Sequence, residues 1–200
     1  ALLALAVLAG CTYSAVMQQH ANPQYVGKPF KRVLVVAATY DDLMRRVVED
    51  RMVTLLGQRG ISGVPGYTLL AKGQTVDQAA LRRVVGESGA DGVFLVRVTN
   101  VDEGAVKIPG YNVTVGVGTG WGGFYDSYTG YWQTTTYAPS TMDVGPVVAA
   151  SQARLFDART GTLAWSATVR TTEQEGSNLG RSLDQYVDAI FNAMVQDGVI

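Results

Sequence analysis

The run Lys31–Ala38 (KRVLVVAA) is the feature that most constrains the fold of this chain. It is continuously apolar after its first two residues, rich in β-branched valine, and short for a helix. A run of this kind predicts a β-strand that is buried on both faces. A second run, Val93–Val101 (VFLVRVTNV), is apolar in its first half and alternates in its second half. That pattern predicts a central strand that emerges toward solvent.

A helix is predicted directly after the first strand. Asp41 and Asp42 can cap it and place acidic groups in its first turn, and apolar residues then recur at helical spacing to about Arg59. Gly60 is a typical helix stop. Two adjacent carboxylates are also compatible with acid–base chemistry, but helix capping explains them better.

Two further helices are predicted from the same signals. Thr75 and Gln78 fit a capping box, which opens a helix that runs to about Ser88. The last helix is capped by Ser177 or Asn178 and ends before a glycine. Its apolar stripe consists of Leu179, Leu183, Tyr186, Val187, Ile190 and Met194.

The segments Val147–Asp157 and Thr162–Thr172 predict a β-hairpin in which Gly161 supplies the positive φ of the turn and Trp165 lies in the core. With the edge strand expected within Ile61–Leu70, the fold class is α/β (α+β). We expect a single mixed sheet of about five strands with three helices, in the order β-α-β-α-β, a hairpin insertion, then β-β-α.

The N-terminal residues predict export. Residues 1–10 are apolar but far short of the ~20 residues of a membrane-spanning helix, which suits part of a signal peptide. No initiator methionine or basic segment precedes them, so we expect the numbering to begin inside a precursor. An ordinary secretory signal, with a cysteine after it only by chance, would also account for these residues.

Leu8-Ala9-Gly10-Cys11 resembles the lipobox of bacterial lipoproteins. The resemblance implies that the Cys11 thiol accepts a diacylglyceryl group and that the chain carries lipid such as palmitate. The next residue is Thr12 rather than aspartate, which by resemblance to Gram-negative lipoproteins implies sorting to the outer membrane, with the domain in the periplasm. Residues 11–30 are then expected to be a lipid anchor and flexible tether in which His20 is solvated, and residues 31–200 a single α/β domain.

An insertion at about residues 105–144 is rich in glycine and tyrosine and holds two of the three tryptophans. It predicts a long hairpin or two extended arms with an aromatic tip. Gly118–Gly123 matches G-x-G-x-x-G, but the residues after it are not expected to be helical, which argues against dinucleotide binding. Exposed aromatic side chains are typical anchors for a partner, with the alternative that the insertion folds back over the sheet. The candidate partner-binding residues are Trp121, Phe124, Tyr125, Tyr128, Tyr131 and Trp132.

Two sequence segments show a wider resemblance: Gly89–Val96 (GADGVFLV) and Leu155–Trp165 (LFDARTGTLAW). They are similar to lipoproteins with the TolB N-terminal-like α/β fold, including the curli-secretion lipoproteins and the lipoprotein activators of penicillin-binding proteins. They also resemble bacterial lipoproteins whose domains have no known function. The resemblance spans most of residues 31–200, implies the fold more than a function, and brings no catalytic residue.

These observations favour a non-enzymatic adaptor of the outer membrane, bound to the membrane by its lipid, that binds a periplasmic protein or the cell wall in envelope assembly or maintenance. A net charge of −1 provides no field that favours nucleic acid. The single cysteine excludes an intramolecular disulfide, and neither a metal nor a cofactor is predicted.

Two other functions stay open. A subunit of an oligomeric secretion pore would use a hairpin made by Ala105–Val117 and Tyr131–Val144. A hydrolase would need a positioned base, and the only histidine is in the expected tether. A carboxylate pair could still form among Glu49, Asp50, Glu87, Asp91, Glu173 and Glu175.

Overall fold

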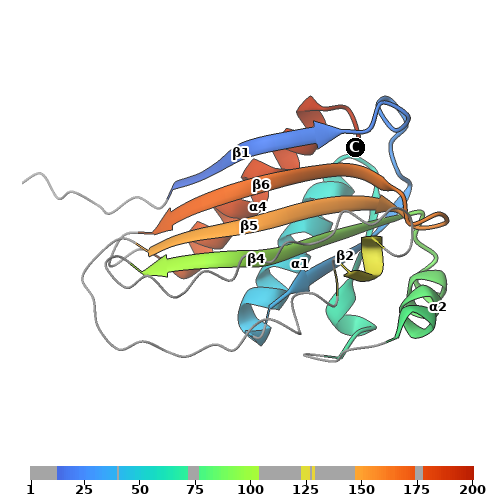
Figure 1. The fold of residues 1–200 in the computed structure, drawn as a ribbon, viewed down its shortest axis with the longest axis horizontal. Coiled ribbons are helices and arrows are strands. Elements are labelled where there is room, and N and C mark those ends of the chain that lie inside the picture. Colours follow the sequence, from blue (N-terminus) through green and yellow to red (C-terminus); the bar gives the residue numbers. More distant parts are fainter. Residues whose placement is uncertain are drawn as a thin grey trace, which may run out of the picture.

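The computed structural model describes residues 13–39, 41–71, 77–103, 123–126, 128, 147–173 and 178–200. These residues form one open, mixed sheet of six strands in the order β1-β6-β5-β4-β2-β3, with helices packed against it (Figure 1). The elements are β1 Tyr13–Ala21, β2 Arg32–Ala38, α1 Asp42–Gln58, β3 Ser62–Pro65, the short 3₁₀ helix Gly66–Thr68, α2 Gln78–Ser88, β4 Gly92–Glu103, β5 Val147–Asp157, β6 Leu163–Glu173 and α4 Leu179–Gln196.

The apolar run Lys31–Ala38 contains β2, an interior strand paired in parallel with both β3 and β4. Its alternate side chains enter two different cores. Val33 and Val35 belong to one core, and Leu34 and Val36 belong to the other. The prediction of a strand buried on both faces is therefore confirmed.

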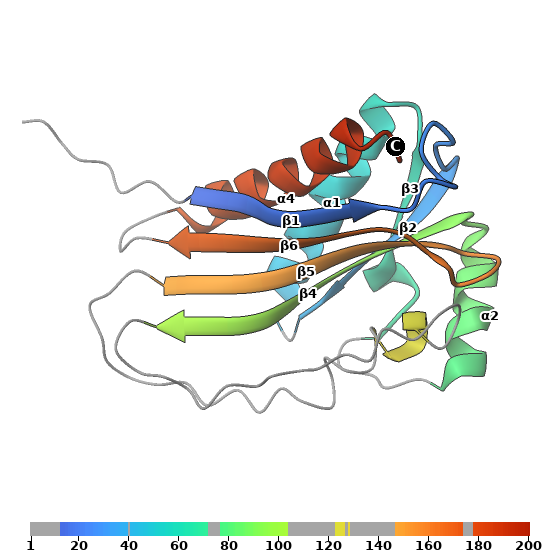
Figure 2. The same ribbon diagram turned by 45° about the horizontal axis from the view of Figure 1, so that its top comes forward.

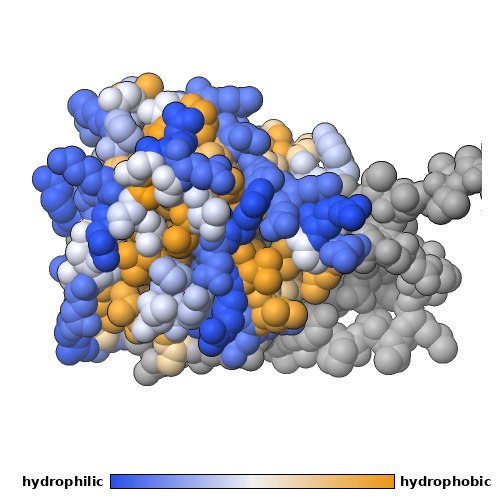
Figure 3. All heavy atoms as spheres, turned by 180° about the vertical axis from the view of Figure 1, so that it is seen from behind, coloured by the Kyte–Doolittle hydropathy of each residue, from blue (hydrophilic) through white to orange (hydrophobic). Residues whose placement is uncertain are grey.

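Helices cover the two faces of the sheet because of the strand order. The connection from β2 to β3 moves outward, and the connection from β3 to β4 moves back across β2. Right-handed crossovers in opposite directions place their helices on opposite faces. Accordingly α1 packs on one face together with α4, and α2 packs on the other (Figure 2). Seen from the side of α1 and α4, hydrophilic residues are interspersed with apolar patches (Figure 3).

Local signals set most helix boundaries as expected. The Asp41 carboxylate accepts a hydrogen bond of 3.0 Å from the Met44 backbone N–H, which confirms its capping role. Asn178 caps α4 in the same way through Arg181. For α2 the prediction of Thr75 as the cap is wrong, because Asp77 is the cap residue and its carboxylate reaches the third amide of the turn.

The β5–β6 hairpin is confirmed. Its turn is organised by Asp157, whose carboxylate accepts backbone N–H bonds of 2.8 Å from Arg159 and 3.1 Å from Thr160, while Gly161 has φ of 71°. Burial raises the pKa of Asp157, but these N–H donors and the Arg159 guanidinium outweigh it, so the pKa lies below its usual value. The ionised carboxylate is thus the form that holds the turn.

Strand β1 corrects the expectation of a tether across residues 11–30. Tyr13–Ala21 forms the sixth strand, at the edge of the sheet, and pairs antiparallel with β6 along its whole length. The register shifts between Val16 and Gln18, so Met17 is an extra residue at a bulge. The bulge interrupts the alternation, and an edge strand has few buried side chains. The sequence of this strand is therefore polar and irregular, as that of a linker would be.

Polar contacts fasten β1 to the rest of the fold. The Asp197 carboxylate, just after α4, accepts a 3.0 Å bond from the Gln19 amide and a 2.7 Å bond from the Trp165 indole N–H. Trp165 is fully buried. At the other end of β1, the hydroxyls of Ser14 and Thr171 lie 2.9 Å apart. One carboxylate thus connects α4, β6 and the edge strand.

Replacing this carboxylate is expected to destabilise the protein. Asp197→Ala leaves the indole N–H of Trp165 buried without an acceptor, which costs about 1–3 kcal/mol of the free energy of unfolding. Urea unfolding measures the loss, and amide hydrogen exchange should show faster exchange in β1 than elsewhere.

The matched control is Asp188→Ala in α4, the helix that Asp197 follows. Asp188 binds the Arg51 guanidinium with oxygens at 2.8 and 2.9 Å, but both side chains are about one-third exposed, so its loss should cost under about 1 kcal/mol. Equal losses in the two variants would contradict the role given to Asp197.

Candidate functional site

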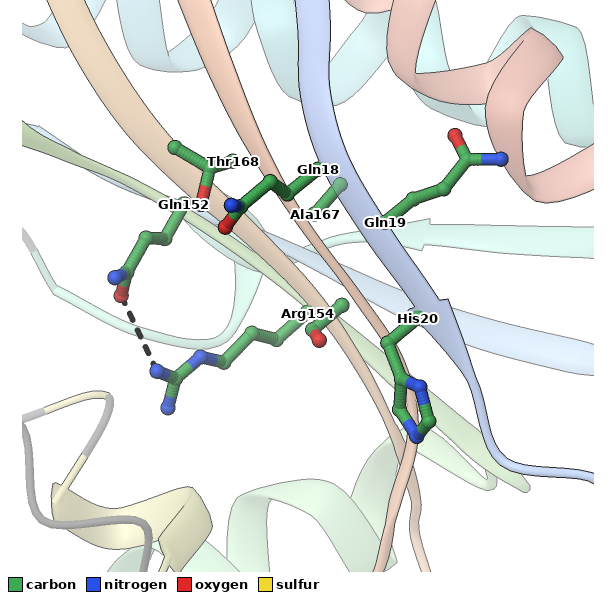
Figure 4. Close-up of a pocket in the computed structure, with 8 residues that line it drawn as sticks. Gln18, Gln19, His20, Gln152, Arg154, Ala167 and Thr168 are labelled. Carbon is green, nitrogen blue, oxygen red and sulfur yellow. Dashed lines mark hydrogen bonds between the residues drawn. The ribbon is translucent and has the colours of Figure 1, made fainter.

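The candidate site lies on the face of the sheet opposite α1 and α4, over strands β1, β6 and β5. It is a hollow of about 420 Å³. Figure 4 shows polar side chains from all three strands around it. The described residues that line it are Gln18, Gln19, His20, Gln152, Arg154, Ser166, Ala167 and Thr168.

Strand register places these side chains in two rows that cross the sheet. The first row runs from Gln18 on β1 through Thr168 and Gln152 to Arg97 on β4. Directly opposed residues in neighbouring strands have close side chains on one face, so each row is a continuous line of hydrogen-bonding groups.

The second row is parallel to the first and two residues along each strand. It joins His20 on β1 to Ser166 on β6 and Arg154 on β5. The bulge at Met17 is what brings Gln18 and His20 onto this face. We call the two rows together the polar face.

Two arginines meet at the centre of the polar face. The Arg97 guanidinium donates a 2.9 Å bond to the side-chain oxygen of Gln152, and the Arg154 guanidinium donates a 3.2 Å bond to the same oxygen. Arg97 is only 3% exposed, and its Nε has no hydrogen-bond partner. A neutral amide is thus shared by two cations.

Burial accounts for the electrostatics of this pair. Desolvation, followed by the positive charge of Arg154, lowers the pKa of Arg97 to about 10. Desolvation also lowers the pKa of Arg154. Both guanidinium groups remain charged at neutral pH, and no salt bridge between described residues involves Arg97. The polar face therefore places two guanidinium groups next to each other.

The aromatic residues predicted to bind a partner are only partly described. Phe124 and Tyr128 are each 1% exposed and belong to the core beneath α2, where the Phe124 ring lies 5.1 Å from that of Phe156. In this structure those two side chains pack on the sheet and do not present a binding surface. Tyr125 is partly buried against the same core. Trp121, Tyr131 and Trp132 lie outside the described residues, as does Cys11.

Residues 123–126 are helical, so the expectation that no helix follows Gly118–Gly123 is wrong for that turn. The rest of the motif lies outside the described residues. The same holds for both arms of the hairpin that a pore subunit would use.

Three of the carboxylates considered for hydrolysis, Glu49, Asp50 and Asp91, have structural partners. Glu49 is fully buried and accepts bonds from the Ala37 and Tyr67 backbone amides and from Arg45. Burial raises the pKa of Glu49 despite these donors. Asp91 accepts backbone bonds from the start of β2, and Asp50 accepts the Tyr67 hydroxyl. These contacts tie α1 and β4 to β2.

Metal-binding clusters and membrane-spanning helices are both absent from the part of the chain that the structure describes. Those residues contain no group of three or more histidine, cysteine, aspartate or glutamate side chains arranged to hold a metal ion. Within the same residues, none of the helices is both long enough and apolar enough to cross a bilayer.

Part of the polar face is visible in the sequence pattern. Gln152 and Arg154 in β5, and Ser166 and Thr168 in β6, alternate with apolar residues and so share one face of the predicted hairpin. The contribution of β1 has no such signal, because the pattern of that segment does not indicate a strand. Arg97 is a second sequence signal, because it is the first charged residue of the apolar strand β4.

Comparison with known proteins gives distant structural similarity alone. No family model and no curated protein matches the chain. Among solved structures, the PelC dodecamer from Paraburkholderia phytofirmans is similar at 14% identity and a TM-score of 0.48, over 95% of this chain and 99% of that one. Lipoprotein GNA1162 from Neisseria meningitidis is similar at 19% identity and a TM-score of 0.42, over 82% and 96%. Both scores are below 0.5, so a function has to be inferred from the residues of this chain.

The burial of Phe124 predicts a stability effect. Phe124→Ala should lower the free energy of unfolding by about 3 kcal/mol, because it removes a large side chain from the core beneath α2. The partly buried neighbour provides the control, and Tyr125→Ala should cost clearly less. Urea denaturation of both variants makes the comparison. Unchanged stability in Phe124→Ala would mean that this segment projects from the sheet.

Proposed function

We propose that the protein is a lipoprotein held at the periplasmic face of the outer membrane by lipid on Cys11, and that it acts by binding rather than by catalysis. The lipobox-like Leu8–Cys11 supports the anchor, and Thr12 supports the choice of membrane. The polar face supports a binding role, since it gathers hydrogen-bonding side chains from three strands around a hollow.

One structural observation carries the proposal further. β1 begins at Tyr13, two residues after Cys11, and pairs with β6 from that residue on. An extended chain advances at most ~3.5 Å per residue, so the lipidated cysteine would be within about 7 Å of the sheet. The anchor would therefore hold one end of the sheet at the membrane surface without a flexible spacer.

The same end of the sheet carries the attachment points of the aromatic insertion. Tyr13 is paired with Thr172, Thr172 with Val148, and Val148 with Asp102 near the end of β4. The insertion therefore leaves β4 and returns to β5 at the end that the lipid would hold. Tyrosine and tryptophan are the side chains that favour membrane interfaces.

This geometry fits an adaptor that is oriented by its anchor. Trp121, Tyr125, Tyr131 and Trp132 remain candidates for contact with a protein or cell-wall partner, and their segment is tethered at the membrane end. The exposed side chain of Tyr13, at 68%, adds an apolar group at that end. We infer a role in assembly or maintenance of the envelope.

The anchor is tested with two substitutions. Cys11→Ser removes the thiol that forms the thioether, so radiolabelled palmitate should no longer be incorporated and the domain should move to the soluble periplasmic fraction. Thr12→Asp should keep the label but shift the protein from the outer-membrane to the inner-membrane fraction.

The two variants separate the claims. Membrane attachment that persists in Cys11→Ser would overturn the lipid anchor. A Thr12→Asp variant that stays in the outer membrane would leave the anchor standing and overturn the inference about sorting.

A further inference from the structure

We propose that the polar face is a binding site for an oxyanion, the phosphate or carboxylate group of a ligand, held by Arg154 and Gln152 with Arg97 supplying a second positive charge. The inference deepens the proposed binding role by naming the chemistry of its ligand. It does not depend on the lipid anchor, because every residue involved lies in the folded domain.

The composition of the hollow favours an anion. Its side chains offer one guanidinium, two glutamine amides, an imidazole and two hydroxyls, because the third glutamine, Gln19, is bonded to Asp197 on the other side of the sheet. None of the described residues that line the hollow is acidic. Carboxylates and phosphates are bound most strongly by charge-assisted bonds from arginine, with amides and hydroxyls completing their shell. The described residues of the hollow thus have the donors for such a group, and none of them is an acid that would repel it.

The buried Arg97 guanidinium is incompletely hydrogen-bonded. A guanidinium that is 3% exposed should have its N–H groups paired, since a buried and unpaired donor costs free energy. Among the described residues, Arg97 instead bonds the neutral oxygen of Gln152, and its Nε has no hydrogen-bond partner. The fold thus retains a cation whose burial is poorly compensated, next to residues that line the hollow.

The charge of Arg154 lies next to that of Arg97. The side-chain oxygen of Gln152 accepts hydrogen bonds from both Arg97 and Arg154. Two positive charges therefore rely on the same neutral amide group. Burial and this proximity lower the pKa of Arg97, so its charged form is disfavoured where it stands. An anion bound beside Gln152 would lessen both the desolvation cost and the repulsion. An arrangement strained without a ligand and relaxed with one is typical of binding sites.

Isothermal titration calorimetry on the full lipidated chain in detergent micelles tests the site. Inorganic phosphate and succinate are titrated separately in a buffer that contains no other oxyanion. We expect one-to-one binding of at least one probe. Preference for phosphate identifies a phosphoryl ligand, and preference for succinate identifies a carboxylate.

Variants assign the binding to the polar face. Arg154→Gln should weaken binding by about tenfold or more through loss of the charge-assisted bonds. Gln152→Glu should abolish it, because the new carboxylate pairs internally with both arginines. Arg59→Gln, which removes an exposed charge at the end of α1, should leave the affinity unchanged and controls for net charge.

Arg97→Met separates binding from structure. The apolar side chain removes a poorly compensated buried charge, so it should raise the melting temperature while it weakens binding of the probe. A lower melting temperature together with unchanged affinity would show that Arg97 is purely structural and would overturn its part in the site.

The proposal as a whole fails if neither probe binds at up to about 10 mM, or if Arg59→Gln weakens binding as much as Arg154→Gln. The Cys11→Ser variant, titrated in the same way, should bind as the lipidated chain does. Loss of anchoring with retained binding would thus be recognised as failure of the anchor alone.

Discussion

The fold depends on two neighbouring parallel strands, β2 and β4, that are apolar on both faces. Such strands are stable only where both faces are removed from water. Two crossovers that run in opposite directions meet this requirement, because they place α1 and α2 on opposite sides of the sheet. Glu49 then fixes α1 to the end of β2 through buried hydrogen bonds. The remaining strands β5, β6 and β1 extend a sheet whose central strands are already covered by helices on both faces.

The polar face begins where the apolar core beneath α2 ends. On the face that α2 covers, Leu95 of β4 is in the core, whereas Arg97, two residues further along the same strand, is the first charged group. The strands beyond, β5, β6 and β1, present glutamine, serine, threonine, arginine and histidine on this side. Arg97 therefore stands at the border between a dry half and a polar half of one sheet face. A cation at such a border is costly to bury, and the proposed oxyanion ligand would offset that cost.

Much of the fold could be predicted from the sequence. The β5–β6 hairpin, the burial of Trp165 and the caps Asp41 and Asn178 all arise from patterns that span a few residues. The candidate site is harder to predict, because its rows join residues more than a hundred positions apart, such as His20 and Ser166. Phe124 and Tyr128 illustrate an ambiguity that the sequence left open, since an aromatic side chain in a glycine-rich segment has the same local pattern whether it projects or packs in a core.

The sequence by itself determined the interior strands, the helices and the lipobox-like Cys11, because periodicity, capping groups and a signal motif are local properties of the chain. Only the tertiary structure decided that Tyr13–Ala21 is a strand, so that the sheet includes a segment that starts two residues after the cysteine. An edge strand obtains its backbone bonds from its neighbour and buries little of its own surface, so its composition is weakly constrained. The neighbour β6 makes a polar segment part of the sheet, and with it completes the polar face.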